Sequence, residues 1–524
     1  MKSGGSYWHQ GLEFCLKHSM RNIDKPTCIS LNVNIDGLPI YKSSIKIFWP
    51  ILCNTHEFPT EPPMIIGIFY GTSKPKDSAE FLDPFIGELL PILSSGIVIN
   101  GHKILVKIRC FICDTPARAF IKCVTSFNGK YGCMKCTTKG TYSYMAKTMT
   151  YPKITAPKRT NEIFRENGYT VHQRGESPLT KLPIDMVEDI IVADSLHLLE
   201  LGVMRKLMNA WRTGSMTKKT KWSTTQKQEI TQFLISVRFP LEMHRRMRSL
   251  EFIGLWKGLE YRNFLNYVGA VILKNYLPEK YYVHFLHLFC AVRICSAKKY
   301  CNFLHIARDL FNDFVINYKF LYGAEYVTSN VHNVCHVVDE VERFGCLPSL
   351  SAYPFENALH SLKKMLRTGP NPLAQVAKRI TEAMQNRKST SLDNDSEFII
   401  SFEQTETMAK IKFKSFILTT NFNNQWFLTN DLKIVCLTGL RKTGNRHLIE
   451  GKYLLRKQDF FQTPFKSSYL HIYSACLNTT NFSSTHLFNV NSVICKFVII
   501  YWKNETVFIP LLHTLDSYSV LGEI

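Results

Sequence analysis

Three acidic residues stand where a carboxylate could hold a metal ion. Asp36 ends the alternating segment CISLNVNID before Gly37, and Asp114 follows HKILVKIRCFIC directly ahead of an expected helix. Glu356 follows Pro354 in the first turn of an amphipathic helix. Carboxylates bind Mg²⁺ through oxygen, and paired ions stabilise the attacking and leaving oxygens of phosphodiester chemistry. Each residue also has an ordinary alternative: a turn Asp, a helix N-cap, and a first-turn Glu favoured by the helix dipole.

The elements around the two Asp residues predict an α/β arrangement. A strand is expected over 28–36, followed by short extended segments and the β-rich run MIIGIFYG. A helix capped by Asp77 or Ser78 precedes a second long strand over 102–114, after which PARAFIKCV starts another helix. Two acids therefore end two separate strands, and sites collect at strand ends in parallel or mixed sheets.

The rest of the chain changes character twice. Apolar residues at helical spacing dominate from about residue 184 to 345, and β-branched and aromatic runs alternate with turn residues from about 397. We divide the chain into 1–27, a leader with one helix; 28–125, the first α/β part; 126–345, a loop-rich CxxC segment and a helical region; 346–396, a return to the first part with the Glu356 helix; and 397–524, a β-rich C-terminal domain.

Composition favours a polyanionic partner. The 64 Lys and Arg residues against 42 Asp and Glu give a formal net charge of +22, and neutralised phosphates release counterions. We find no secretory signal and no apolar run long enough for a membrane span; VICKFVIIYW is expected to be a buried strand. The 16 Cys residues are scattered, which is typical of reduced thiols in a cytosolic or nuclear protein.

Six blocks of the sequence look like the conserved blocks of transposase domain-containing proteins, which are distantly similar to CACTA (En/Spm-type) element transposases. Their order and spacing, over roughly residues 6 to 385, carry the resemblance more than any single block. The blocks are NVNIDGLPIYKSSIKIFWPIL, CFICDTPARAF, YGCMKC, RTNEIFR, SPLTKLPIDMVEDIIVADSLHLLELGVMRKLMNAW and NVHNVCHVVDEVERFGCLPSLSAYPFENALHSLKKMLR.

The resemblance implies an RNase H-like mixed sheet core interrupted by a large all-α insertion ahead of the last acid. It implies that Asp36, Asp114 and Glu356 form a catalytic triad holding two Mg²⁺ (or Mn²⁺) ions, and that the chain cuts DNA and joins the freed 3′-hydroxyl to another phosphodiester. Asp194 and His197, in ADSLHLLELG, match an Asp-x-x-His signature that braces the active site or touches DNA. A capping Asp beside a packed His is the open alternative.

The partners implied are double-stranded DNA and further copies of the chain, in the nucleus and without a membrane. Lys363, Lys364 and Arg367 on the Glu356 helix, with the basic loop 147–174, are the candidate phosphate contacts. A solvated basic surface is the alternative. Related proteins commonly carry a DNA-binding region ahead of the first strand; none is visible here, so we expect this chain to lack sequence-specific recognition of element ends.

A structural zinc site is a second expectation. Cys133 and Cys136 have the CxxC spacing of half a tetrahedral site, and their sulfurs should lie about 3.5 to 4 Å apart if they share zinc. Cys123 and His172 are the expected partners. The family often has a His where Phe127 stands, which counts against zinc.

A second CxxC pair and the functional alternatives remain. Cys110 and Cys113 lie within the strand leading to Asp114, so burial is their expected role.

Three functions stay open: an active transposase, a catalytically inactive domesticated transposase that binds DNA or chromatin, and an RNase H-like nuclease without strand joining.

Overall fold

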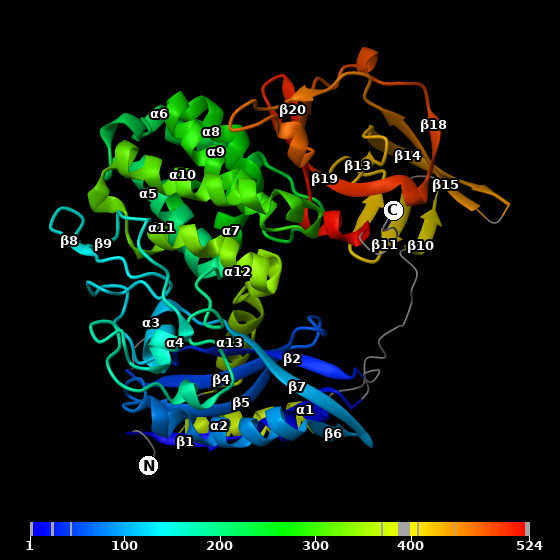
Figure 1. Ribbon diagram of the computed structural model, residues 1–524. Helices are drawn as coiled ribbons and strands as arrows, with labels where there is room; N and C mark the ends of the chain where they lie inside the picture. The colour runs from blue at the N-terminus through cyan, green and yellow to red at the C-terminus, as the bar shows by residue number, and fades with distance from the viewer. Residues whose placement is uncertain are drawn as a thin grey trace. The chain divides into compact units, whose positions relative to one another are not determined.

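The computed structural model describes residues 4–21, 26–41, 45–367, 370–385, 399–405, 408–444 and 446–518. Two compact units divide the chain, and each is built from two separate segments (Figure 1). Unit 1 comprises Met1–Leu199 with Ala324–Asp393, and unit 2 comprises Glu200–Gly323 with Asn394–Ile524.

A seven-stranded mixed sheet forms the centre of unit 1. Its strand order is β1-β5-β4-β2-β7-β6, with β3 paired to β4. The strand β4 is antiparallel to both β2 and β5, whereas β7 is parallel to β2. The strands are β1 (Ser6–His9), β2 (Cys28–Ile35), β3 (Leu38–Pro39), β4 (Ile47–Thr55), β5 (Met64–Gly71), β6 (Ile97–Ile99) and β7 (His102–Phe111).

The helices α1 (Leu12–Ser19), α2 (Ser78–Ser95) and α3 (Thr115–Ile121) belong to the same sheet unit. Asp77 caps α2 by accepting the Ala79 N–H, as one of the two sequence alternatives predicted. The apolar face of α2 packs into the sheet core, where each large buried side chain stabilises the fold by roughly 1.5–3 kcal/mol. The first 27 residues, expected as a leader with one helix, also supply β1, which pairs with β5 at the sheet edge.

The remainder of unit 1 is irregular chain and short helices. The segment before residue 199 holds β8 (Thr141–Ser143), β9 (Thr148–Thr150), α4 (Asn161–Arg165), η1 (Pro178–Lys181) and the start of the π-helix η2 (Ser195–Met204). The returning segment holds α11 (Ser329–Asn333), η8 (Val334–His336), α12 (Val337–Phe344), η9 (Leu347–Leu350), α13 (Tyr353–Lys364) and α14 (Pro372–Gln385).

Unit 2 combines a helical segment with antiparallel sheets. Its helices are α5 (Arg205–Thr213), α6 (Thr224–Ser236), α7 (Gly258–Asn263), α8 (Gly269–Tyr276), α9 (Glu279–Ile294) and α10 (Leu304–Tyr322), with short helical turns between them. An eight-stranded sheet has the order β16-β17-β20-β19-β13-β14-β15-β18, and β10-β11-β12 form a smaller one.

The strands of unit 2 are β10 (Ile399–Gln404), β11 (Ala409–Phe413), β12 (Ile417–Thr419), β13 (Trp426–Thr429), β14 (Ile434–Thr443), β15 (Arg446–Tyr453), β16 (Gln458–Asp459), β17 (Tyr473–Ala475), β18 (His486–Asn489), β19 (Val493–Trp502) and β20 (Glu505–Pro510). The run VICKFVIIYW is strand β19 and is largely buried, as predicted. The expected mixed α/β class with a β-rich C-terminal region is thus confirmed.

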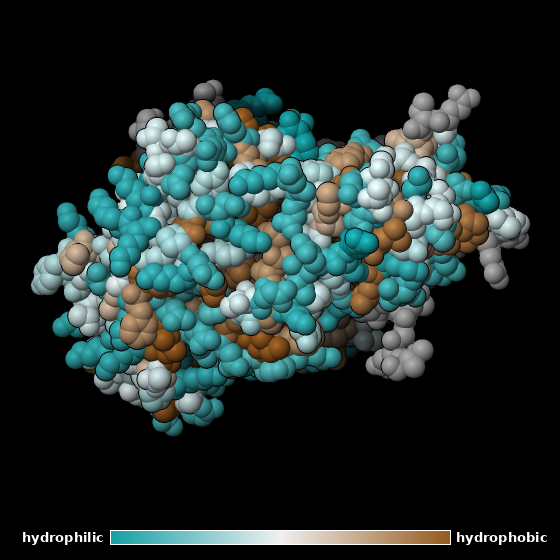
Figure 2. Space-filling view, turned by 90° about the horizontal axis from the view of Figure 1, so that it is seen from above, coloured by the Kyte–Doolittle hydropathy of each residue, from teal (hydrophilic) through white to brown (hydrophobic). Residues whose placement is uncertain are grey.

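The described helices include none with the length and apolarity that a bilayer span requires. On the face shown in Figure 2, hydrophilic side chains predominate and hydrophobic ones form only scattered patches.

Candidate functional site

Asp36 and Asp114 leave the sheet at the same edge. The strands β2 and β7 run parallel, with Val33 opposite Phe111, and the Ile112 N–H donates to the Val33 carbonyl at 2.8 Å. Each Asp lies three residues beyond that pair, so the two strands deliver their carboxylates side by side. The parallel pairing of β2 with β7 is therefore the feature that positions both acids.

Asp194 reaches this edge on a third stretch of backbone. Ile190 pairs in parallel with the end of β7, and Asp194 follows four residues later. Its Oδ1 accepts the Ala352 N–H at 2.8 Å, one residue before α13 begins. The Asp194 carboxylate therefore fixes the start of the helix that carries Glu356.

His197 connects Asp194 with Glu356. Its Nδ1 lies 2.5 Å from Asp194 Oδ2, and its Nε2 lies 3.4 Å from Glu356 Oε1. Burial opposes protonation of this imidazole, but its bonds to Asp194 and Glu356 prevail and raise its pKa to about 10. A cationic imidazole therefore stands between the two carboxylates at neutral pH.

The three candidate triad acids influence one another electrostatically. Burial, followed by the negative charges of Asp114 and Glu356, raises the pKa of Asp36 to about 8, against the lowering effect of His197. Burial also raises the pKa of Asp114, and Glu356 adds to that shift. The parallel strands place Asp36 beside Asp114, His197 contacts Glu356, and the influence of Asp114 and Glu356 on the pKa of Asp36 indicates that the three acids lie within electrostatic range of one another.

The ordinary alternatives for these residues hold in part. Asp114 caps α3 by accepting the Ala117 N–H at 2.8 Å, and Asp36 Oδ1 accepts the Gly37 N–H at 2.6 Å. Each of these bonds uses one carboxylate oxygen, so capping fixes the side chain without consuming the whole carboxylate. A group of carboxylates in which the pKa values of Asp36 and Asp114 are raised is suited to a divalent cation with oxygen ligands.

A second cluster in unit 1 consists of Cys133, Cys136, His332 and His336. All four side chains are buried, and their ligand atoms lie within 4.8 Å of one another. The two sulfurs are 3.5 Å apart, which agrees with the spacing predicted for a shared ion. Cys136 Sγ lies 3.3 Å from His332 Nε2, and Cys133 Sγ lies 3.5 Å from His336 Nε2.

The two imidazoles share a face because α11 and η8 form a continuous helical run, on which residues four apart are neighbours. Burial raises the pKa of Cys133, but the Cys136 thiol and the two imidazoles outweigh burial and lower it well below the ordinary value. A thiolate is the metal-binding form of cysteine. Two sulfurs and two imidazoles could hold a metal ion such as zinc.

The expectation that Cys123 and His172 complete this site is wrong. Cys123 Sγ lies 3.1 Å from the hydroxyl of Ser78, and His172 Nδ1 lies 2.7 Å from the carbonyl of Tyr131. His332 and His336, from a segment nearly two hundred residues later, take their places.

The expectation for the other CxxC pair is confirmed. Cys110 and Cys113 are both fully buried, and Cys113 Sγ accepts the Ile35 N–H at 3.3 Å. This contact joins β2 to the end of the neighbouring strand.

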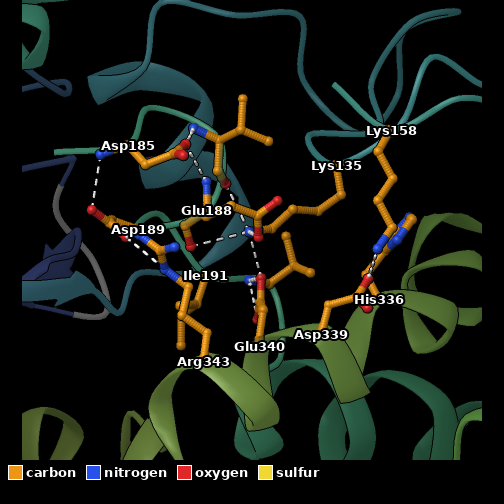
Figure 3. Close-up of polar contacts among 12 residues, drawn as sticks. Lys135, Lys158, Asp185, Glu188, Asp189, Ile191, His336, Asp339, Glu340 and Arg343 are labelled. Carbon is orange, nitrogen blue, oxygen red and sulfur yellow. Dashed lines mark hydrogen bonds and ion pairs between the residues drawn. The ribbon is translucent and has the colours of Figure 1, made fainter. Parts of the chain in front are cut away.

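A polar network connects the Cys/His cluster with the chain leading to Asp194 (Figure 3). Lys135, inside the CxxC, pairs with the fully buried Glu340 at 2.7 Å and donates to the Val187 carbonyl at 2.7 Å. Glu340 in turn accepts the backbone N–H groups of Val192 and Ala193, at 2.8 and 2.6 Å. Figure 3 also shows Arg343 of α12 reaching Asp189, with a shortest separation of 2.5 Å.

The candidate DNA contacts have mixed surroundings. All three candidate side chains, Lys363, Lys364 and Arg367, are exposed. Lys363 also donates to the Pro39 carbonyl at 2.9 Å. Within the basic loop 147–174, Arg159 is buried and donates to the Cys133 carbonyl, so it holds the loop.

Sequence reasoning missed His332, His336, Lys135 and Glu340. The signal for the histidines was present in NVHNVCHVVDEVE, where a spacing of four on a helix places two imidazoles on one face. Lys135 and Glu340 carry no sequence signal, because a charged residue inside a CxxC and one on an amphipathic helix are both expected at the surface.

A family model described as Domain of unknown function (DUF8592) matches residues 392–511, which include most of the β-rich part of unit 2. No curated protein matches the chain.

Proposed function

We propose that this chain is a DDE-type DNA transposase, or a protein derived from one, that cuts and joins DNA strands. The sheet of unit 1 supports this proposal: three antiparallel strands, a helix and a fourth strand parallel to the first agree with an RNase H-like core. The long helical segment between Asp194 and Glu356 agrees with an all-α insertion before the last acid.

The single observation that carries the proposal is the convergence of Asp36, Asp114 and Glu356. These acids are far apart in the sequence, yet the charges of the other two raise the pKa of Asp36. A capping Asp, a turn Asp and a first-turn Glu with only local roles have no reason to meet. Asp36 and Asp114 follow the ends of parallel strands, and Glu356 lies within electrostatic range of Asp36 from the first turn of α13; a position at such strand ends is typical of a site for substrate and metal.

The donor set fits divalent cations. The possible ligand atoms of Asp36, Asp114 and Glu356 are all oxygens. Burial and the negative charges of the other two acids destabilise the ionised form of Asp36, and a bound cation would stabilise it. Paired Mg²⁺ or Mn²⁺ ions, when bound there, would supply Lewis-acid stabilisation of attacking and leaving oxygens. The protein itself would orient Glu356 through His197 and would fix the Asp114 side chain by its capping bond to the N-terminus of α3. Burial would limit the access of water to the carboxylates.

A nicking assay on supercoiled plasmid with Mg²⁺ or Mn²⁺ tests the proposal. We expect each of three substitutions to lower the nicking rate at least a hundredfold: Asp36→Asn, Asp114→Asn and Glu356→Gln. Asp83→Asn, which changes an exposed Asp on α2, is the matched control and should retain it. Nicking that survives all three substitutions would refute the proposed site.

Two further outcomes decide between the alternatives. Strand joining by a substrate with a free 3′-hydroxyl supports a transposase, whereas nicking alone supports a nuclease. Binding of duplex DNA with neither activity supports an inactive, domesticated DNA- or chromatin-binding protein, for which the net charge of +22 is the favouring observation. We place the protein in the nucleus and propose that it acts as a homo-oligomer on double-stranded DNA.

The Cys/His cluster supports a structural zinc ion as part of the same proposal. Four protein ligands of the Cys₂His₂ type, all buried, leave no open position, as structural sites require. The ion would join the CxxC loop to the helical run that precedes α13, and so support the segment carrying Glu356.

A further inference from the structure

A concave surface in unit 2 is lined by arginines. It has a volume of about 550 Å³ and lies where α7 and the preceding loop meet the chain that follows β20. Its charged side chains are Arg245, Arg246, Arg248, Arg262, Glu242 and Glu260. We call this surface the arginine pocket.

Both carboxylates of the arginine pocket are neutralised by partners of their own. Glu260 is fully buried and receives Arg248 Nε at 2.6 Å and Arg248 Nη2 at 2.5 Å. Glu242 pairs with the buried Lys496 at 2.9 Å and accepts the Ile417 N–H at 2.8 Å. Glu260 also lies 3.6 Å from Arg245, whereas no ion pair joins either acid to Arg246 among the described residues.

Two arginines of the pocket, Arg245 and Arg246, are exposed. Arg246 is exposed and makes no ion pair with any described residue, and Arg245 lies only at 3.6 Å from Glu260. The buried side chain of Met247 anchors the loop between Arg246 and Arg248, and Arg248 also donates to the Leu255 carbonyl at 2.6 Å. Arg248 and Met247 therefore fix the backbone of this loop, and the exposed side chain of Arg246 beside them adds positive charge to the pocket.

The chemistry of this surface selects phosphate. Guanidinium groups present planar, paired donors that match the oxygens of a phosphodiester, and they stay charged at any physiological pH. We propose that the arginine pocket binds the backbone of duplex DNA, through phosphates and without reading bases. Affinity for phosphodiesters follows from the arginines alone, whereas the choice of duplex DNA rests on the proposed function.

Fluorescence anisotropy of the full chain with a labelled 30-base-pair duplex of arbitrary sequence tests this inference. The double variant Arg245→Ala/Arg246→Ala should bind about tenfold more weakly at 0.1 M NaCl. The slope of log affinity against log salt should become shallower by about 1 to 2, at roughly 0.9 per lost phosphate contact. The single variant Arg246→Glu, at a residue that pairs with no acid in the described part of the chain, should show the larger loss per substitution.

The matched control is Lys218→Ala/Lys219→Ala, which removes two exposed charges of unit 2 from η3 (Lys218–Thr220). Equal losses in both double variants would overturn a specific pocket and leave only general charge. A loss confined to single-stranded RNA of the same length would overturn the assignment to duplex DNA. Binding is measured without divalent cations and nicking with them, so a failure of the nicking proposal and a failure of this inference give different results.

Discussion

His197 lies 3.4 Å from Glu356 through one ring nitrogen and 2.5 Å from Asp194 through the other. The imidazole thus links a carboxylate that fixes the start of α13 to one that α13 carries. This relationship gives the Asp-x-x-His pair a positioning role: Asp194 organises backbone, and His197 orients Glu356. The alternative, a capping Asp with a merely packed His, does not account for the contact with Glu356.

We predict that His197→Ala lowers nicking by about 10- to 100-fold, the usual effect of losing a group that orients a metal ligand. The concentration of Mg²⁺ giving half-maximal activity should rise, because Glu356 loses its orienting partner. Nicking measured across a Mg²⁺ titration checks this. His360→Ala, an exposed residue on the same helix, is the control; unchanged Mg²⁺ dependence in His197→Ala would contradict the positioning role.

Loss of the Cys/His cluster should remove a bound metal and destabilise unit 1. Cys133→Ser is expected to lower zinc content, measured by elemental mass spectrometry, from about one equivalent per chain to none, and to lower the thermal midpoint. Wild-type protein treated with a strong zinc chelator should behave similarly. Cys301→Ser, at an exposed thiol, should change neither quantity. Full zinc content in Cys133→Ser would exclude this cluster.

Glu340 is expected to matter for both stability and activity. Glu340→Gln leaves the buried Lys135 with only Glu188, 3.6 Å away, as a counter-charge, and breaking a buried pair costs about 3–5 kcal/mol of unfolding free energy. Urea denaturation measures this cost, and nicking should fall as the chain before Asp194 loosens. Glu162→Gln, at an exposed residue of α4, is the control. A loss below 1 kcal/mol would show that the pair does not hold the segment.

Lys496 gives a pH-dependent prediction in unit 2. Burial lowers its pKa to about 8, from 10.5, although Glu242 opposes the shift. Between these values the unfolded state binds more protons than the folded state, so stability rises with pH across that window.

The comparison that isolates this effect is wild type against Lys496→Met. The difference in unfolding free energy, wild type minus variant, should increase from pH 7.5 to pH 10.5 by on the order of 3 kcal/mol, from about 1.4 kcal/mol per pKa unit. Urea unfolding at the two pH values measures it. An equal difference at both would mean that the folded protein keeps the ordinary lysine pKa.

The sequence predicted local features of unit 1 well. Alternating apolar residues located β2, and a β-rich run bounded by prolines located β5. The N-cap at Asp77 and the Asp114 position ahead of α3 follow from local turn chemistry. Such patterns are short-range, so a single sequence carries them.

Features that depend on distant contacts were not predictable in the same way. The strand β1 forms by pairing with β5 at the edge of the sheet. Its four residues are too few for a pattern of alternating apolar side chains that would predict a strand. The sequence interpretation chose Cys123 and His172 as partners of the CxxC pair because they are near in sequence. In the folded chain, His332 and His336 lie beside the two cysteines instead. The positions of Asp36 and Asp114 at two strand ends suggested a common site for these two acids, whereas a catalytic triad that includes Glu356 was implied by the family resemblance.

Both clusters of unit 1 draw residues from its two chain segments, which are separated in the sequence by the helical segment 200–323 of unit 2. During synthesis, Asp36, Asp114 and the CxxC emerge from the ribosome long before His332 and Glu356 exist. The early segment must therefore wait with an unfilled carboxylate edge while the intervening helices fold, since domains form as their residues appear. Closing so long a loop costs only slightly more than closing a short one, so unit 1 can be completed as soon as the residues up to α14 (Pro372–Gln385) have been synthesised.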